Sequence, residues 1–413
     1  MNAYTTVQKS LRVAGALLLM AAATPAVSGP REWVALDAGL SAASGEVFGF
    51  SIAADPRVNP VLALESVDSG GVSVMRWHQR QWEGLGSTFP GASGPMLAID
   101  AERRLYLCTS GKYAGTGAPN VFRWKHGAWT AVGGDIAAEA GYRSVAKHVV
   151  DACGGIAVTE NGDPVVTWTA QVGAKSWAVF AARWDADLQR WLPMGDGAIA
   201  GGRSVSTQIA VDARDRPYLA TTTMVGAGLG RVTTAQVWHW DGQAWGQLGP
   251  EIPGGESAVV GVHENQPYLA LHYVERDAGA GTVAVDEMRV MRWRRGAWEA
   301  LPSAGVGTGR PSLDFSSSGR PVIGFVESAD GGQILAARVM LWSGKNWRNV
   351  GEAAASTRCD LPSCYPEASL DLSLDAWGRP ILVWKERSYQ VDGDGNWLPV
   401  HRLQVKRYGG ELP

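Results

Sequence analysis

The chain has 413 residues, of which 46% are hydrophobic and 19% charged, and it contains 52 glycines and 21 prolines. This composition is too apolar for a disordered chain and too rich in glycine for an all-helical one. The formal net charge of −3 lacks the basic excess of nucleic-acid-binding proteins, so we expect no nucleic-acid partner. Length alone allows two or three domains, but an all-β fold can carry this much chain as one unit.

Residues 1–28 have the pattern of a secretory signal peptide. Basic residues precede an apolar run at positions 13–23, and small residues at positions 26–28 suit a cleavage site. The run is shorter than the about 20 residues that span a bilayer, and no other long apolar segment follows. We therefore predict an exported protein, periplasmic or extracellular, without a membrane span, whose domain comprises residues 29–413.

The four cysteines favour two disulfides, because exported proteins keep cysteines oxidised. Three pairings exist, and we predict Cys359–Cys364 within a short loop and Cys108–Cys153 between neighbouring repeats. In the chain-entropy model these disulfides contribute about 2 and about 4 kcal/mol, respectively. The alternative, a metal or redox site, lacks any C-x-x-C or Cys–His spacing.

A tryptophan-rich string recurs six times along the chain. Its clearest copies are VFRWKHGAW from Val121, VWHWDGQAW from Val237 and VMRWRRGAW from Val290. In each copy two tryptophans flank a polar turn, which predicts two strands joined by a tight turn. An apolar residue follows three positions after the second tryptophan. The six pairs are Trp77/Trp82, Trp124/Trp129, Trp184/Trp191, Trp240/Trp245, Trp293/Trp298 and Trp342/Trp347.

A second string, an apolar strand followed by a polar turn and another apolar strand, occurs seven times and alternates with the first. Clear copies are QIAVDARDRPYLATT from Gln208 and SLDFSSSGRPVIGFVE from Ser312. The seventh tryptophan pair is divided between the two ends, with Tyr408 at the first position and Trp33 at the second. A closed ring explains this division, because an N-terminal strand that completes the last sheet removes the open edge. We therefore predict an all-β fold, a seven-bladed β-propeller of four-stranded antiparallel blades, closed by the N-terminal strand.

The repeat resembles those of a known group of proteins. The pattern V-x-R-W-x-x-G-x-W-x-x-[LV], followed by S-L-x-[LF]-x-x-x-G-R-P, is similar to the Trp-rich β-propeller repeats of bacterial secreted and surface proteins. The resemblance covers the whole mature chain and implies the architecture, while related propellers include lectins, adhesion modules and polysaccharide lyases. In this fold the tryptophans either fill the wedge-shaped gaps between blades, which we favour, or form a sugar platform repeated around the ring.

Carboxylates that depart from the repeat gather in blades six, seven and one. Asp314 replaces a small residue in the innermost strand of blade six, and Asp371 lies in that strand of blade seven. Glu327 and Glu386 occupy equivalent positions in the second strands, and Glu65 lies one place short of that position in blade one. We predict these five as ligand-binding residues, because clustered carboxylates can bind sugar hydroxyls or a cation, or act as an acid. The alternative is that the glutamates are solvated strand ends and that backbone amides satisfy Asp314.

No catalytic motif is present, and we assign no catalytic residue. His272 and Tyr273 are the candidates, because a His–Tyr pair could serve as base and acid in a polysaccharide lyase. Arg310 and Arg387 are available to neutralise a uronate carboxylate. The chain has no G-x-S-x-G, phosphate-loop or H-E-x-x-H sequence.

We expect no cofactor and no metal. The loop 392–396, with sequence DGDGN, has oxygen ligands at alternate positions, like the first half of a calcium loop. It lacks the later glycine and the bidentate glutamate, so we favour a hairpin turn and keep calcium as the alternative.

Two functions from different classes fit these observations. The first is an exported, non-catalytic, monomeric module that binds a glycan or a protein through the face with the long, irregular loops. The alternative is a carbohydrate-active enzyme, similar to a polysaccharide lyase, with its site in blades five to seven.

Overall fold

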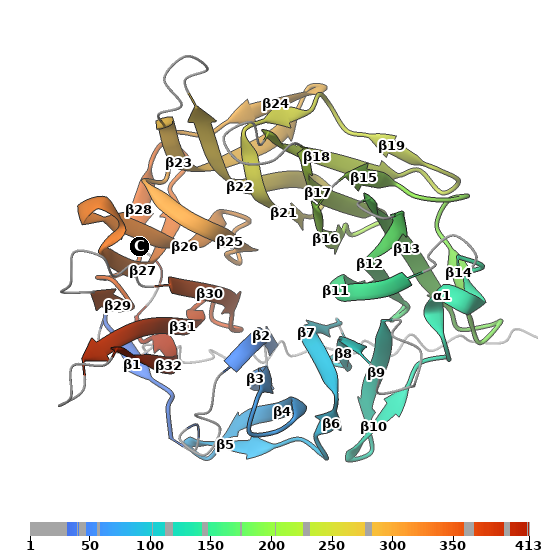
Figure 1. The fold of residues 1–413 in the computed structure, drawn as a ribbon, viewed down its shortest axis with the longest axis horizontal. Coiled ribbons are helices and arrows are strands. Elements are labelled where there is room, and N and C mark those ends of the chain that lie inside the picture. The colour runs from blue at the N-terminus through green and yellow to red at the C-terminus, as the bar shows by residue number, and fades with distance from the viewer. Residues whose placement is uncertain are drawn as a thin grey trace, which may run out of the picture.

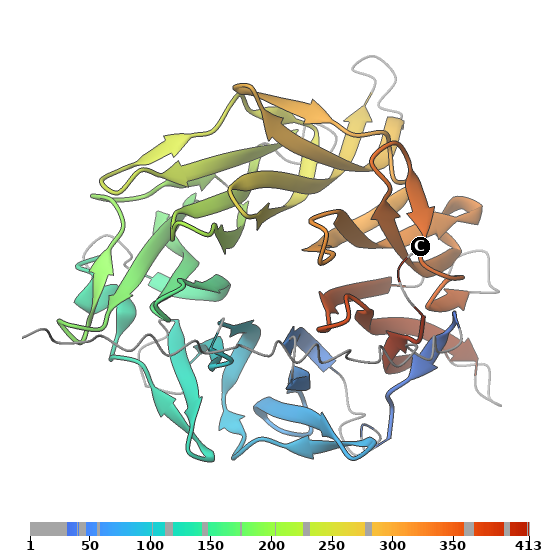
Figure 2. The same ribbon diagram turned by 180° about the vertical axis from the view of Figure 1, so that it is seen from behind.

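The computed structural model describes residues 31–412, apart from 39, 41–46, 56–57, 101, 112–118, 143–147, 174–175, 203, 226–231, 277–282, 359–366, 392–396 and 411. The predicted signal peptide lies outside the described residues. Seven β-sheets stand as blades around a central channel (Figures 1 and 2). In each blade four antiparallel strands, termed A to D, follow one another from the channel outward. The predicted seven-bladed β-propeller is confirmed.

Each blade takes its strands A to D in chain order, except that the N-terminal strand is strand D of blade 7. Blades 1 to 4 contain β2 (Val47–Asp55), β3 (Val58–Ser66), β4 (Gly71–His78), β5 (Gln81–Gly84); β7 (Ala92–Ile99), β8 (Leu105–Gly111), β9 (Asn120–Lys125), β10 (Ala128–Ala131); β11 (His148–Val158), β12 (Pro164–Gly173), β13 (Ser176–Asp185), β14 (Arg190–Pro193); β16 (Ser204–Val211), β17 (Pro217–Val225), β18 (Val232–Trp240), β19 (Trp245–Gln247). Blades 5 to 7 contain β21 (Gly255–His263), β22 (Gln266–Arg276), β23 (Val283–Arg294), β24 (Ala297–Ala300); β25 (Gly307–Phe315), β26 (Pro321–Ala329), β27 (Ile334–Trp342), β28 (Trp347–Asn349); β30 (Glu367–Leu374), β31 (Pro380–Val391), β32 (Trp397–Tyr408), β1 (Trp33–Ala35).

Short additional elements complete four of the blades. In these blades strand C is longer than strand D, and a short extra strand pairs with the part of strand C that strand D leaves free. The extra strands are β6 (Phe89–Pro90), β15 (Ala200–Gly202), β20 (Ile252–Pro253) and β29 (Ala355–Arg358). The helix α1 (Ile136–Glu139) lies between blades 2 and 3, where the Asp135 carboxylate accepts from the Ala138 amide at its N-terminus. Ile136 is fully buried there, in a cluster with Trp168 and Phe180.

The N-terminal strand closes the ring. β1 pairs antiparallel with β32, with Trp33 opposite Tyr408 and Ala35 opposite Lys406. The rings of Trp33 and Tyr408 meet edge to face with 5.5 Å between centroids. Both ends of the domain therefore lie in one sheet, as the divided repeat predicts.

The six tryptophan pairs of blades 1 to 6 are in ring contact, with 5.2–5.6 Å between ring centroids. Five of them meet edge to face, and the rings of Trp240 and Trp245 are tilted by 55°. In every blade the strand-D tryptophan also donates its indole N–H to a backbone carbonyl of the preceding blade or of the segment that leads from it. For example, Trp191 donates to Val132 over 2.9 Å, and Trp33 donates to Glu352 over 3.1 Å. The tryptophans therefore join blade to blade, which favours the wedge-filling interpretation over the sugar platform.

At the junction of blades 2 and 3, a glycine follows the carbonyl acceptor Val132, where the chain passes the Trp184 ring. At Gly133 φ is +71°, and an added Cβ would lie 2.6 Å from an atom of the Trp184 ring. Both the left-handed backbone and the close approach require glycine at this position.

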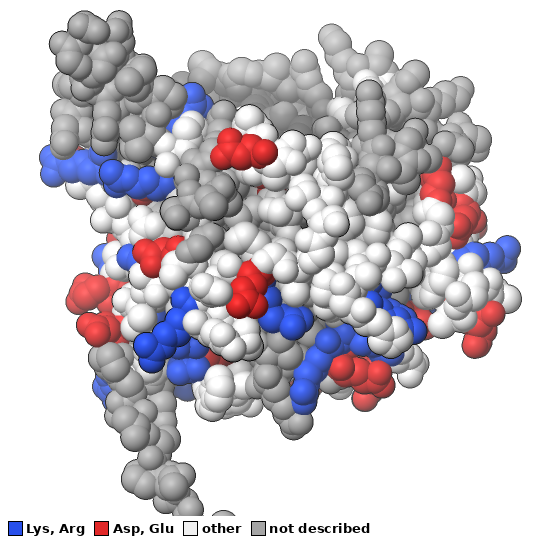
Figure 3. Space-filling model, turned by 90° about the horizontal axis from the view of Figure 1, so that it is seen from below, with Lys and Arg blue, Asp and Glu red and all other residues white. Residues whose placement is uncertain are grey.

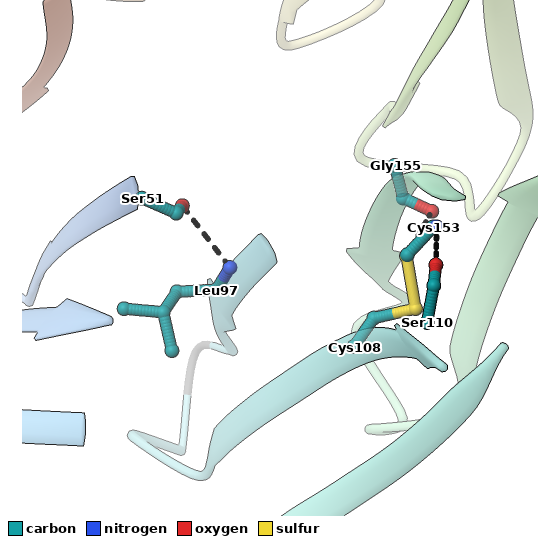
Figure 4. Close-up of a disulfide and its surroundings, with 6 residues drawn as sticks. All are labelled: Ser51, Leu97, Cys108, Ser110, Cys153 and Gly155. Carbon is teal, nitrogen blue, oxygen red and sulfur yellow. Dashed lines mark hydrogen bonds between the residues drawn. A yellow bond between two sulfur atoms is a disulfide. The ribbon is translucent and has the colours of Figure 1, made fainter. Parts of the chain in front are cut away.

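The predicted disulfide between repeats is confirmed. Cys108 of β8 and Cys153 of β11 join blades 2 and 3, with 6.1 Å between Cα atoms (Figure 4). Both residues are buried. The predicted Cys359–Cys364 pair lies outside the described residues.

Candidate functional site

Strand direction divides the surface into two faces. The A–B and C–D turns lie on one face, termed the turn face, and the B–C and D–A connections lie on the other, the loop face. Three of the longest B–C connections include the segments 112–118, 226–231 and 277–282, which lie outside the described residues. On the side shown in Figure 3, Lys and Arg side chains are interspersed with Asp and Glu among the described residues.

A cavity of about 410 Å³ occupies the central channel, and all seven innermost strands contribute to its wall. Its size lies in the range of small-ligand sites. The lining residues fall in the first half or the middle of strand A on blades 1, 6 and 7 and in its second half on blades 2 and 3. The cavity therefore lies about the middle of the channel and extends toward the loop face at blades 1, 6 and 7. The polar residues of the lining are Ser51, Gln208, Arg310, Ser312, Ser369 and Asp371.

Several of these polar side chains join neighbouring blades. In four junctions a strand-A side chain accepts a hydrogen bond from a backbone amide of the next blade. Ser51 accepts from Leu97 in this way (Figure 4), and Asp371 accepts from Ile52 over 3.0 Å across the closing junction. Strands of different blades do not pair with each other, so these side chains supply the acceptors for backbone amides that face the preceding blade.

Arg310 is an exposed residue of the channel wall and carries a positive charge. It lies in a β-bulge of β25, where the pairing with β26 shifts register between Thr308 and Ser312. Gly309 has a φ of +75° and makes this bulge possible. The walls of the channel desolvate the guanidinium and so lower the pKa of Arg310, while the nearby Asp371 carboxylate opposes that shift.

Asp371 and Asp314 lie on neighbouring blades but have different surroundings. Burial raises the pKa of Asp371, while hydrogen bonds from the Ile52 and Leu372 amides and from Ser312 oppose the shift. Burial raises the pKa of Asp314 to about 6, although the amides of Phe315 and Leu374 donate to it. Backbone amides satisfy Asp314, as its alternative interpretation expected.

Glu65 contacts the next blade. Its carboxylate accepts from the Gly94 amide of blade 2 over 2.9 Å. Near the equivalent position of strand B, Ser110 accepts from the Cys153 amide (Figure 4) and Thr222 accepts from the Ala258 amide. Glu65 is therefore one member of a second set of links between blades.

The two remaining glutamates have partners within their own blades. Glu386 is fully buried, accepts from the indole N–H of Trp384 over 2.6 Å and lies 3.5 Å from Arg402, so it is not a solvated strand end. Glu327 forms a 2.7 Å ion pair with Arg338.

The carboxylates of blade 6 do not share one cleft. Asp314 pairs with Val322, five residues before Glu327 on β26, so roughly 17 Å of strand separates the two positions. Of the five predicted carboxylates, Asp371 alone lines the channel cavity within the described part of the chain.

The catalytic candidates lie in the second strand of blade 5, in its loop-face half. His272 is 8% exposed; its Nε2 lies 2.8 Å from Asp286 and its Nδ1 lies 3.8 Å from Glu256. The guanidinium of Arg289 covers the ring of Tyr273 at 3.5 Å. Neither candidate is part of the described lining of the channel cavity.

The described residues show neither a metal-ligand cluster nor a membrane-spanning helix. No group of three or more His, Cys, Asp or Glu side chains among them could hold a metal ion, and the possible calcium loop 392–396 falls outside them. Their helices include none that is long and apolar enough to cross a membrane.

From the sequence, Arg310 is expected only as a possible neutralising charge and not as part of the channel wall. The signal was present in Gly309-Arg310-Pro311, since a glycine and a proline within a strand mark a bulge.

No protein-family model and no curated protein sequence matches the chain. The structure of an ulvan lyase from a polysaccharide lyase family matches with a TM-score of 0.53 at 9% identity, over 93% of this chain and 94% of its own. A variant lectin of Aleuria aurantia in complex with α-methyl-L-fucoside matches with a TM-score of 0.45 at 11% identity, over 76% and 96%. An α-L-arabinanase of Penicillium chrysogenum matches with a TM-score of 0.43 at 13% identity, over 77% and 93%.

Likeness at this level of identity defines the architecture and not the activity. The sheet order, the closing strand and the ulvan lyase match together define the protein as a seven-bladed β-propeller. Its placement among the Trp-rich secreted proteins of bacteria stays a prediction from the repeat.

Proposed function

We propose that the protein is an exported, non-catalytic β-propeller module that binds an acidic glycan in the channel cavity on its loop face. The observation that carries the proposal is the bulge of β25, which presents the exposed Arg310 to a cavity walled by all seven blades. The disulfide between blades 2 and 3 supports an exported location, because such bonds persist in oxidising compartments.

The lining supplies the chemistry that an acidic sugar requires. The planar guanidinium of Arg310 can form two parallel hydrogen bonds to a carboxylate or sulfate. Ser369 and Asp371 offer partners for sugar hydroxyls, and Phe50 and Leu370 provide an apolar wall for the carbon face of a ring. In this proposal Asp371 keeps its hydrogen bonds from Ile52, Leu372 and Ser312 and accepts a further one from a sugar hydroxyl. Glu65, Glu327, Glu386 and Asp314 do not contact the ligand.

Calorimetric titration with oligogalacturonate and with a chondroitin sulfate hexasaccharide tests the proposal, with a cello-oligosaccharide as the neutral comparison. We expect at least one acidic probe to bind, and Arg310→Ala to weaken binding about tenfold to hundredfold, as expected when a charged hydrogen-bond donor is removed. Arg348→Ala, which removes an exposed arginine from the outer strand β28, is the matched control and should bind normally. Unchanged binding by Arg310→Ala, or binding of a protein ligand with no glycan bound, would refute the acidic-glycan proposal.

A lyase reaction at His272 and Tyr273 is the second candidate. The observation in its favour is that His272 lies between two carboxylates, Asp286 and Glu256, beside Tyr273. Incubation with polyuronates distinguishes the two functions, because a lyase releases unsaturated products that absorb in the ultraviolet. The binding proposal expects no such product. Product formation that disappears in His272→Ala or Tyr273→Phe would replace it with the enzyme.

A further inference from the structure

A second cavity lies on the turn face, between blades 2 and 3, and also measures about 410 Å³. Its walls are strands of blade 2, the A–B turn of blade 3 and the C–D hairpin of blade 3. It shares no lining residue with the channel cavity. We term it the turn-face groove.

The A–B turns of five blades have one common geometry. The first residue of the turn accepts, through its side chain, a hydrogen bond from the amide of the last residue, four positions later. In blades 2, 4 and 7 these two residues are an aspartate and an arginine that also form an ion pair. In blade 6 they are a serine and an arginine. The pairs are Asp100/Arg104, Asp212/Arg216, Asp375/Arg379 and Ser316/Arg320.

Blade 3 departs from this pattern at the turn-face groove. Its turn begins with Thr159 and ends with Asp163, so a carboxylate stands where the other four turns have a guanidinium. Within the described part of the chain, the Asp163 carboxylate forms no hydrogen bond or ion pair. Asp163 is half-buried. Desolvation raises the pKa of its carboxyl group, and the positive charge of Arg183 opposes that shift. A half-buried carboxylate without such a partner lowers the stability of the folded state, and its oxygens are available to a ligand.

The remaining walls offer complementary groups. Arg123 and Tyr106 of blade 2 line the groove and form a side-chain hydrogen bond with each other, which leaves further N–H groups of the Arg123 guanidinium for a ligand. The indole of Trp184 supplies an aromatic surface. Arg104 is already engaged, because Asp100 and Glu102 pair with it and the Asn161 carbonyl accepts from it. The groove thus combines an acceptor, Asp163, with a donor, Arg123, so it has no strong excess of either charge.

We propose that the turn-face groove is a second saccharide-binding site, which takes one or two neutral sugar residues through their hydroxyl groups. A carboxylate accepts from two adjacent hydroxyls, an arginine donates to a third, and an indole packs on the carbon face of the ring. A strongly anionic ligand fits less well, because it would meet Asp163. The volume lies in the range of sites for small ligands. This site goes beyond the proposed channel function and does not depend on it.

Saturation-transfer NMR with the methyl glycosides of glucose, galactose, mannose, fucose and N-acetylglucosamine tests the site, followed by titration with those that respond. We expect at least one glycoside to bind the wild type. Asp163→Asn, which removes the charge at nearly constant volume, should weaken binding about tenfold. Asp163→Arg should abolish binding, because it restores the residue that ends the turns of blades 2, 4, 6 and 7.

Two controls separate this site from the channel and from misfolding. Asp187→Asn removes an exposed carboxylate from the C–D hairpin of the same blade, outside the groove lining, and should bind as the wild type does. Arg310→Ala should also keep the neutral-sugar signal while it loses acidic ligands. No response from any of the five glycosides, or unchanged binding by a folded Asp163→Arg variant, would overturn the proposal.

Discussion

The outer rim of this propeller repeats one contact in every blade, whereas the residues of the channel wall differ from blade to blade. At the rim all seven blades use the same contact, an aromatic pair whose strand-D indole N–H bonds back toward the preceding blade. In the channel, equivalent strand-A positions carry different residues, such as Ser51, Gly155, Gln208 and Asp371. Because the ring closes only if every junction fits, the rim contact is repeated in every blade. In the proposed channel site, by contrast, a single ligand contacts a different side chain on each blade. Departures from the repeat are therefore the better guide to function.

The largest expected effect is a loss of stability when a tryptophan of the rim is removed. Trp191 is fully buried and donates to Val132, so Trp191→Ala leaves a cavity and an unpaired carbonyl. We expect a loss of about 3–5 kcal/mol of unfolding free energy, measured by denaturant titration. Trp377, which is 73% exposed on the turn face, is the matched control, and Trp377→Ala should change stability by less than about 0.5 kcal/mol. Equal losses in the two variants would contradict a rim that holds the ring together.

The second effect concerns the covalent link between blades 2 and 3. Replacing Cys108 and Cys153 together with serine should cost about 2–4 kcal/mol, since the bond closes a loop with a sequence separation of 45. The wild type under reducing conditions should lose at least as much, because reduction also opens the predicted Cys359–Cys364 bond. If the variant unfolds at the same denaturant concentration as the oxidised wild type, the disulfide does not stabilise the ring.

The third effect compares two glutamates that the sequence grouped together. Glu65→Ala leaves the Gly94 amide without its acceptor and should cost about 1–3 kcal/mol. Glu327→Ala removes an ion pair whose side chains are 35% and 26% exposed and should cost at most about 1 kcal/mol. A larger loss for Glu327→Ala would show that the links between blades are not the stronger contacts.

The smallest effect is a pH dependence from Asp314. Its pKa is raised to about 6 in the folded protein, above about 3.9 in an unfolded chain. Between these values the native state binds more protons, so this group's contribution to stability falls as pH rises from about 4 to about 6. The melting temperature of the wild type relative to Asp314→Asn should therefore be roughly 1–3 °C higher at pH 4 than at pH 7. A difference that is constant, or that grows with pH, would contradict the raised pKa.

The fold could be predicted from the sequence because the residues of the repeat indicate strands and turns by local pattern alone. Paired tryptophans around a turn and the divided unit at Trp33 and Tyr408 predict both the number of blades and the closure. The spacing of Cys108 and Cys153 across two repeats predicts their bond in the same way.

The candidate site could be predicted only in part. The sector of blades six, seven and one does contribute to the channel, but the partners of each carboxylate depend on packing that no local pattern records. The Gly94 amide beside Glu65 and the buried indole beside Glu386 are examples. The sequence repeat does carry a signal for Asp163, an aspartate where four other repeats have arginine. Its surroundings could not be predicted, because the groove beside it is formed by packing between blades 2 and 3.

The most direct test of the central claim is a crystal structure of the protein with the acidic oligosaccharide that binds most tightly in the titrations. We predict the sugar in the channel cavity on the loop face, with a carboxylate or sulfate within hydrogen-bonding distance of the Arg310 guanidinium. An empty channel, with the sugar bound elsewhere on the molecule, would contradict this claim.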